Sequence, residues 1–129
     1  MATFLLDTSV IIDVLNGKRE RDVLLTRLLN AGNLLACCPV NISEIYAGMR
    51  PKEQIATENF LESLDFYEIT WRVAKLAGLL KRDYSKKGLT LSLPDTTIAA
   101  VAIEYDLTLI TDNIKDFPMP EVRLYQRDR

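Results

Sequence analysis

Short apolar segments alternate along this chain with longer segments of helical period. The apolar segments are typical of buried strands, and they cover residues 2–6, 34–40, 66–70, 107–111 and 122–125. Apolar residues recur at a helical spacing over residues 9–16, 21–31, 42–49, 52–64, 71–87 and 95–105. Gly17, Gly32 and Gly88 follow three of these segments closely, as expected where a helix ends. Residues 89–94 are predicted to form a loop.

This alternation predicts an α/β fold in which a mainly parallel sheet of about five strands lies between helices. The chain has 129 residues and neither an internal repeat nor a linker-like segment, so we expect a single domain over residues 1–129. Ligands of such sheets bind beyond the carboxyl ends of the strands, where the strand order reverses. Asp7 follows the first predicted strand and Asp112 follows the fourth, so we expect both at that edge.

Composition narrows the class of protein further. Hydrophobic residues make up 48% of the chain and charged residues 26%, as in folded soluble domains. No apolar run reaches the roughly 18 residues that a membrane helix needs, and the N-terminus does not resemble a signal peptide, so we expect a cytoplasmic protein without a membrane segment. The adjacent Cys37 and Cys38 are predicted to be buried thiols, which fits a reducing compartment.

The sequence contains no histidine, and this absence limits its chemistry. A metal-free ribonuclease commonly uses imidazole for proton transfer near neutral pH, and zinc hydrolases commonly use it as a ligand. Hydrolysis by this chain would therefore depend on carboxylates and a hard cation such as Mg²⁺ or Mn²⁺.

Four places in the sequence carry an acid in apolar surroundings. They hold Asp7, Glu44, Asp95, and the pair Asp112 and Asp116. Each acid also has a structural explanation, because Asp7, Asp95 and Asp116 could cap backbone N–H groups and the others could be solvated. If several of them converge, they repel one another unless some protonate or a divalent cation binds between them. The sequence therefore favours a divalent-metal site without proving that the acids meet.

Four stretches resemble the motifs of the PIN domain family, and more narrowly of VapC-type toxins from bacterial or archaeal toxin–antitoxin pairs. They read LLDTSVIID, NISEIYAGMR, LSLPDTTIAAVAIEYDLTLIT and TDNIKDF. They occur in the order and spacing of the family and cover essentially the whole chain. The resemblance implies a three-layer α/β/α fold with acids gathered at the carboxyl edge of the sheet.

By motif position, Asp7, Glu44 and Asp95 match the first three acids of the family. The fourth is less well defined, because this chain has Asn113 where other PIN proteins carry an acid. We expect Asp116 in that role, with Asn113 as a polar neighbour, and Asp112 stays open as a substitute.

The resemblance implies a metal-dependent endoribonuclease that hydrolyses RNA phosphodiesters with Mg²⁺ or Mn²⁺. Asp7 and Asp95 would hold the ion, with Glu44 and Asp116 completing the set. Thr8, Ser9 and Thr111 would hydrogen-bond the carboxylates that hold the metal, or else cap local backbone. The implied partners are a VapB-type antitoxin, an RNA substrate and a second copy of the chain.

Other side chains are predicted to serve binding rather than chemistry. Cations that could guide an RNA backbone toward an acidic pocket are Arg19, Arg21, Lys81, Arg82, Lys86 and Lys87. Trp71 and Tyr84 could stack on bases, although Trp71 is expected to pack in the core. The helical pair within residues 9–31 carries more apolar surface than one core face needs, which favours a partner groove or a dimer contact.

Three alternatives remain at this point. A receiver-like or phosphatase-like domain is disfavoured, because Ser9 stands where a phosphatase needs a second aspartate. A catalytically silent PIN module that binds RNA or antitoxin stays open, as does a PIN nuclease that acts on DNA.

Overall fold

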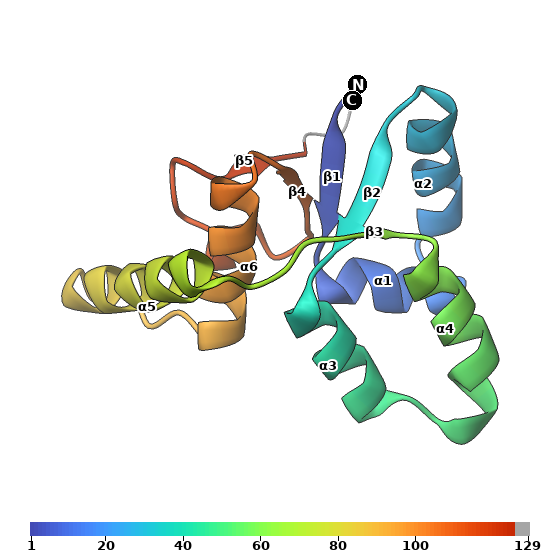
Figure 1. The fold of residues 1–129 in the computed structure, drawn as a ribbon, viewed down its shortest axis with the longest axis horizontal. Helices are drawn as coiled ribbons and strands as arrows, with labels where there is room; N and C mark the ends of the chain where they lie inside the picture. The colour runs from blue at the N-terminus through green and yellow to red at the C-terminus, as the bar shows by residue number, and fades with distance from the viewer. Residues whose placement is uncertain (126–129) are drawn as a thin grey trace.

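The structure, a computed structural model, describes residues 1–125 of the chain. Five parallel strands form one sheet in the order β3-β2-β1-β4-β5 (Figure 1). The strands are β1 (Thr3–Leu6), β2 (Leu34–Cys37), β3 (Asp65–Phe66), β4 (Thr108–Ile110) and β5 (Arg123–Leu124). The chain builds outward from β1 in both directions, so the strand order reverses at β1.

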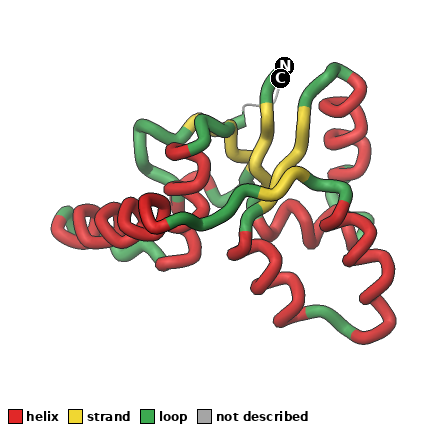
Figure 2. The backbone as a smooth tube through the Cα atoms, viewed as in Figure 1, coloured by secondary structure: helices red, strands yellow, loops and turns green. Residues whose placement is uncertain are grey.

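Helices cover both faces of this sheet, as Figure 2 shows. The α-helices are α1 (Thr8–Leu15), α2 (Arg21–Asn30), α3 (Pro39–Gly48), α4 (Gln54–Glu62), α5 (Trp71–Lys86) and α6 (Leu93–Glu104). Two short 3₁₀ helices are η1 (Pro51–Glu53) and η2 (Ile114–Asp116). The expected three-layer α/β/α arrangement around a parallel sheet is confirmed.

Alternation of side chains along β1 divides the interior into two cores. Leu5 faces a core formed with α5 and α6, which includes Val73 and Ile98. Phe4 and Leu6 face the opposite core, which α1, α2 and α4 complete. α6 is buried almost all round, which explains why its sequence is nearly free of polar residues after the first turn.

Several element boundaries differ from the expected ones for identifiable reasons. β2 ends at Cys37 because Pro39 lacks an N–H group and instead occupies the first turn of α3. α6 begins inside the expected loop, because the Ser92 side chain accepts a hydrogen bond from the Asp95 backbone N–H at 3.2 Å. The expected strand over residues 66–70 is reduced to Asp65–Phe66.

Two helices, α1 and α2, end close to the glycines that the sequence analysis placed after them. Gly17 and Gly32 have φ angles of 64° and 87°, a conformation that glycine adopts without steric cost just beyond a helix. Within residues 1–125 no helix is both long and apolar enough to cross a bilayer. The last seven residues, RLYQRDR, form a basic stretch, and residues 126–129 of it lie outside the described part of the chain.

The central strand supplies a test of this core. Leu5 is fully buried between sheet and helices, so Leu5→Ala should lower the free energy of unfolding by about 2–5 kcal/mol through lost burial and cavity formation. Urea denaturation followed by circular dichroism measures the change. Ile55→Ala removes an aliphatic side chain that is 76% exposed and should leave the midpoint nearly unchanged. Equal effects of the two substitutions would contradict the packing.

Candidate active site

Asp7 lies at the carboxyl end of β1, where the strand order reverses, and is only 6% exposed. Its backbone N–H donates to the Ile110 carbonyl at 3.0 Å, which joins the ends of β1 and β4. Its Oδ1 accepts a hydrogen bond from the Thr8 N–H at 2.9 Å, and its Oδ2 accepts one from the Thr111 hydroxyl at 2.7 Å. Asp7 therefore caps α1 and also lies at the functional edge of the sheet.

Glu44 lies on α3 and is connected to Asp7 through its neighbour Thr8. The Thr8 hydroxyl donates to Glu44 Oε1 at 2.7 Å. Asn41, which is fully buried, donates through Nδ2 to the Thr8 hydroxyl at 3.0 Å and to the Leu6 carbonyl at 3.2 Å. Its Oδ1 accepts a hydrogen bond from the Cys38 N–H at 2.8 Å, so the amide is fixed from both sides.

Asn41 holds Thr8 in place, a role that the motif analysis missed. The signal was available in the sequence, because an amide side chain stands one helical turn before Glu44 and between the apolar residues Val40 and Ile42. Only the tertiary structure shows that it bonds to Leu6 and Thr8 at the end of β1 and to Cys38 just after β2, and so joins the ends of the two strands.

Asp95 is half-buried in the first turn of α6. Burial raises the pKa of its carboxyl above the ordinary value of 3.8, and the negative charges of Asp116, Asp7 and Glu44 raise this pKa further. The Ser92 hydroxyl opposes part of the rise by hydrogen-bonding the carboxylate. The three other acids expected in the site are thus close enough for their charges to act on Asp95.

The loop after β4 separates the two candidates for the fourth acid. Asp116 ends η2, is half-buried, and is the acid with the largest electrostatic effect on Asp95. Asp112 is instead paired with arginines: its Oδ2 accepts from Arg19 Nη1 at 2.9 Å and also from Arg21 Nη2. Asn113 is exposed, and its backbone N–H donates to the Thr111 hydroxyl at 3.0 Å.

The hydroxyl groups near the acids differ in their partners. Thr8 and Thr111 each donate to a carboxylate, Thr8 to Glu44 and Thr111 to Asp7. Ser9 Oγ is buried and has no hydrogen-bond partner among the described residues. It is one residue beyond Thr8 in the first turn of α1.

The donor set of the site consists entirely of oxygen atoms, which suits a hard divalent cation. None of the ion pairs among residues 1–125 involves Asp7, Glu44, Asp95 or Asp116, so a bound cation would compensate their charge. In the same part of the chain, no three His, Cys, Asp or Glu side chains are arranged to hold one ion directly. The chemistry of the residues fits a cation whose shell includes water, as Mg²⁺ prefers.

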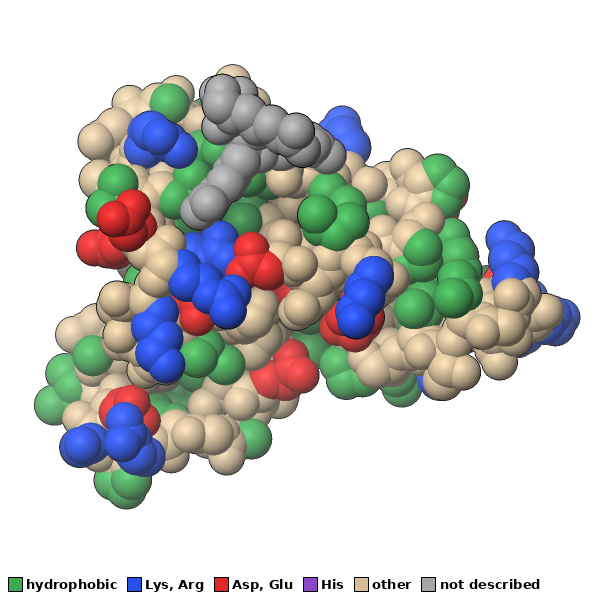
Figure 3. Space-filling view, turned by 180° about the vertical axis from the view of Figure 1, so that it is seen from behind, with side chains coloured by type: hydrophobic (Ala, Val, Ile, Leu, Met, Phe, Trp, Pro, Cys, Tyr) green, Lys and Arg blue, Asp and Glu red, His purple; other side chains and the backbone are tan. Residues whose placement is uncertain are grey.

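The cations predicted to bind RNA have different environments. Arg21 is 4% exposed and lies between acids, so it cannot reach a polyanion as placed. The ammonium group of Lys81 donates to the Leu91 carbonyl at 2.6 Å, and Arg82 pairs with Asp83. Lys86 and Lys87 are exposed at the end of α5. Figure 3 shows basic side chains in separate groups with acids beside several of them, and no continuous basic surface on that face.

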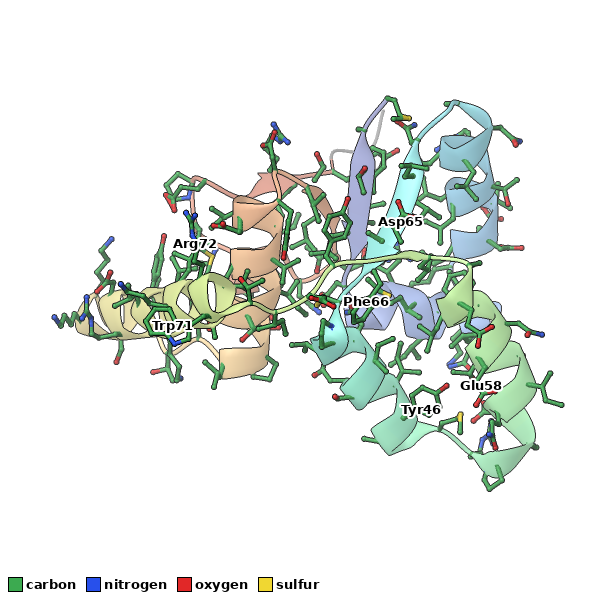
Figure 4. All side chains as sticks on the ribbon, in the orientation of Figure 1. Tyr46, Glu58, Asp65, Phe66, Trp71 and Arg72 are labelled. Carbon is green, nitrogen blue, oxygen red and sulfur yellow. The ribbon has the colours of Figure 1, made fainter. Side chains whose placement is uncertain are left out.

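The expectation that Trp71 packs in the core is wrong. Trp71 is the first residue of α5, and its side chain lies on the outside of the molecule (Figure 4), where it is 76% exposed. Lys75 Nζ lies 5.6 Å from the centroid of the indole ring. Periodicity placed it on the helix, but as the first helical residue it precedes the buried face that begins at Val73. Tyr84 is half-buried against the core of α5 and α6.

Comparison with known proteins identifies the family. The family model described as PIN domain matches residues 4–118. This chain belongs to the PIN domain family. The family resemblance read from the motifs is thereby confirmed.

Two curated relatives of this PIN domain chain are ribonucleases of the VapC type by name. Ribonuclease VapC19 of Mycobacterium tuberculosis is 35% identical over 115 residues, which span 89% of this chain and 92% of the relative. Ribonuclease VapC2 of Haemophilus influenzae is 30% identical over 122 residues, 91% of each chain.

Solved structures of similar fold come from toxin–antitoxin complexes. VapBC2 from Rickettsia felis, bound to a promoter DNA fragment, superposes with a TM-score of 0.84 at 24% identity, covering 95% of this chain and 97% of its counterpart. A toxin–antitoxin complex from Klebsiella pneumoniae gives a TM-score of 0.71 at 29% identity, covering 95% of both chains. The fold of this PIN domain chain is therefore that of chains in such complexes.

The raised pKa of Asp95 predicts a gain in stability when its charge is removed. In metal-free protein the fold favours the protonated carboxyl, so its contribution to stability is fully present below the ordinary pKa of 3.8 and is lost as pH rises through the folded pKa. Asp95→Asn should therefore raise the urea midpoint near neutral pH, and the difference from the wild type should disappear in acid.

Asp116→Asn should lower the pKa of Asp95, as measured by carboxyl ¹³C NMR titration. An unchanged Asp95 pKa in that variant would show that the two acids do not interact.

Proposed function

We propose that this chain is a single-domain, divalent-metal-dependent endoribonuclease and the toxin of a VapBC-type toxin–antitoxin pair. The observation that carries the proposal is a group of acids, without ion-pair partners among residues 1–125, at the switch point of a parallel sheet. The relatives named ribonuclease VapC support RNA as the substrate. Cellular RNA as the target favours action in the cytoplasm.

We assign the metal to Asp7 and Asp95, with Glu44 and Asp116 contributing directly or through water. Mg²⁺ or Mn²⁺ held there supplies Lewis-acid stabilisation of charge on the phosphate oxygens. Thr111 and Thr8 keep Asp7 and Glu44 oriented through their hydrogen bonds. Asp116 is favoured over Asp112 because Asp112 is already paired with arginines.

Glu44 is suited to orient the attacking water. Its Oε1 accepts from Thr8, whereas Oε2 accepts no hydrogen bond from residues 1–125 and the side chain is exposed. A carboxylate in this position can accept a hydrogen bond from water and align it with the phosphorus. In-line attack then leaves a 5′-phosphate and a 3′-hydroxyl. Exposed side chains that could guide the RNA backbone are Arg19, Arg82, Lys86 and Lys87.

Apolar surface on the helical pair supports the partner assignment. α1, α2, α4 and β2 border a hollow whose apolar lining residues are Val14, Leu25, Leu29, Leu34, Leu35, Phe60 and Leu64. Leu29 is half exposed there. Val23 is another exposed apolar residue of α2, outside this hollow. We propose that this hollow accepts an apolar segment of a VapB-type antitoxin and that the chain also pairs with itself through other exposed apolar residues.

The nuclease assignment predicts cleavage of RNA that requires metal. Purified protein should cut RNA with Mg²⁺ or Mn²⁺ and stop when EDTA is added. Asp7→Asn and Asp95→Asn should each reduce the rate by at least about 100-fold, the upper range for losing even an outer partner of a metal site. Glu121→Gln alters an exposed acid beside β5 and should leave the rate unchanged. Cleavage of single-stranded DNA but not RNA, or metal-independent cleavage, would contradict the assignment.

The toxin assignment predicts growth arrest that a partner relieves. Expression of the chain should stop bacterial growth, and co-expression of the antitoxin from the adjoining gene should restore it. Leu29→Glu places a charge in the apolar hollow, so this variant should keep its ribonuclease activity yet escape neutralisation. Growth assays and RNA cleavage with and without antitoxin measure both effects. Full neutralisation of the Leu29→Glu protein would place the antitoxin elsewhere.

A further inference from the structure

Four charged side chains beside the acidic site connect residues 13–21 with the loop after β4, which is about 90 residues further along the sequence. Asp13 comes from α1, Arg19 from the turn after it, Arg21 from the start of α2, and Asp112 from the loop after β4. Arg21 donates from Nη2 to Asp112 Oδ2 and from Nε to Asp13 Oδ2 at 3.5 Å. Arg19 Nη1 adds a bond of 2.9 Å to the same Asp112 oxygen. These contacts hold the loop after β4 against α1 and α2.

Burial makes this pairing obligatory for Arg21. Its side chain is 4% exposed, and that of Asp13 is 14% exposed, whereas Asp112 remains 41% exposed. A buried guanidinium without partners is strongly unfavourable, and its planar array of N–H groups allows it to bond two carboxylates at once. Arg21 can therefore fix the position of Asp112 more firmly than an exposed ion pair could.

The backbone before Arg21 adopts a conformation that needs support. Arg19 and Glu20 have φ angles of 57° and 52°, in the left-handed region that residues with a Cβ rarely occupy. Such residues persist where surrounding contacts impose them. In this turn, Arg19 and Arg21 bond to Asp112, and Arg21 also bonds to Asp13, so their side chains connect the segment to the loop after β4 and to α1.

Asp112 is the immediate neighbour of a residue that orients the acidic site. Thr111 donates to Asp7 Oδ2 at 2.7 Å and accepts from the Asn113 N–H at 3.0 Å, after which the chain enters η2 and reaches Asp116. The loop is thus held at two consecutive residues, Thr111 by Asp7 and Asp112 by the arginines. A shift of Asp112 would change the position of Thr111 on one side and of Asp116 on the other.

We propose that Arg21 is a positioning residue of the nuclease: by holding Asp112 it sets the loop that orients Asp7 through Thr111 and brings Asp116 to Asp95. The inference rests on the proposed function, and it assigns Arg21 to the metal site rather than to RNA. It also gives Asp112 a role other than that of a metal ligand. Arg19 strengthens the same contact from the solvent side.

Asp112→Ala is the principal test, because Arg21 keeps Asp13 as a partner and the protein is expected to fold. The Mn²⁺ dissociation constant, measured by isothermal titration calorimetry, should rise about 10-fold or more, as when an outer partner of a metal site is removed. The kcat for RNA should fall, whereas KM should stay within about twofold. Asp112→Asn retains an acceptor oxygen for Arg21 and should restore most of the affinity. Arg123→Gln removes an exposed arginine–aspartate pair beside β5 and should change neither quantity.

Arg21→Lys separates positioning from direct ligation by Asp112. If Arg21 positions the loop, Arg21→Lys also weakens Mn²⁺ binding, and the double variant with Asp112→Ala is no worse than the stronger single effect. If Asp112 were a ligand, Arg21→Lys would release it and tighten Mn²⁺ binding, which would overturn the proposal. A lowered thermal midpoint with an unchanged Mn²⁺ constant in folded Asp112→Ala protein would overturn it too. A rise in KM alone would do the same by indicating RNA contact. Failure of the wild type to cleave RNA would reject the proposed function instead, while the Mn²⁺ constants would still test positioning.

Discussion

Repulsion among carboxylates is the constraint on which this molecule depends. Asp7, Glu44, Asp95 and Asp116 come from four separate parts of the fold. Burial raises the pKa of the Asp95 carboxyl, and the charges of the other three acids raise this pKa further. A fold that only needed stability would place such groups apart. Two hydrophobic cores, one on each face of the short parallel sheet, stabilise the fold and so offset the cost of this arrangement. A bound cation would relieve the remaining repulsion.

Hydrogen bonds from polar side chains hold the acids in a defined geometry despite their repulsion. Asn41 connects the ends of β1 and β2 and holds Thr8, which in turn holds Glu44. Thr111 performs the corresponding task for Asp7 from the end of β4. Because each of these groups is paired, the site is organised without a cation in place, and little reordering is needed when one binds. The arginine pair on Asp112 extends this organisation to the loop that carries Asp116.

The local contacts of the basic residues say more about their roles than the net charge of the chain does. The formal net charge is −2, yet the basic residues are engaged in different tasks: Arg21 inside the fold, Lys81 on a carbonyl, Arg82 on Asp83. Residues 18–21, which read KRER, therefore contain the exposed Arg19 and the buried Arg21, and their spacing alone does not distinguish them. Burial distinguishes the two arginines. The Arg21 guanidinium is buried between two carboxylates, so it already has structural partners and is not free to bind RNA.

The sequence by itself determined the class of fold and, through the family motifs, named the candidate acids. Alternating apolar and helical segments predicted a mainly parallel sheet, because helices on both of its faces bury such segments. The absence of histidine indicated chemistry by carboxylates and a metal ion. Only the tertiary structure showed that Asp112 pairs with arginines whereas the charge of Asp116 acts on Asp95. It also showed that Asn41 supports Thr8 and that Trp71 faces solvent. The reason is physical: periodicity reports which face of an element is apolar, whereas the partner of a polar side chain lies far along the chain and is set by packing.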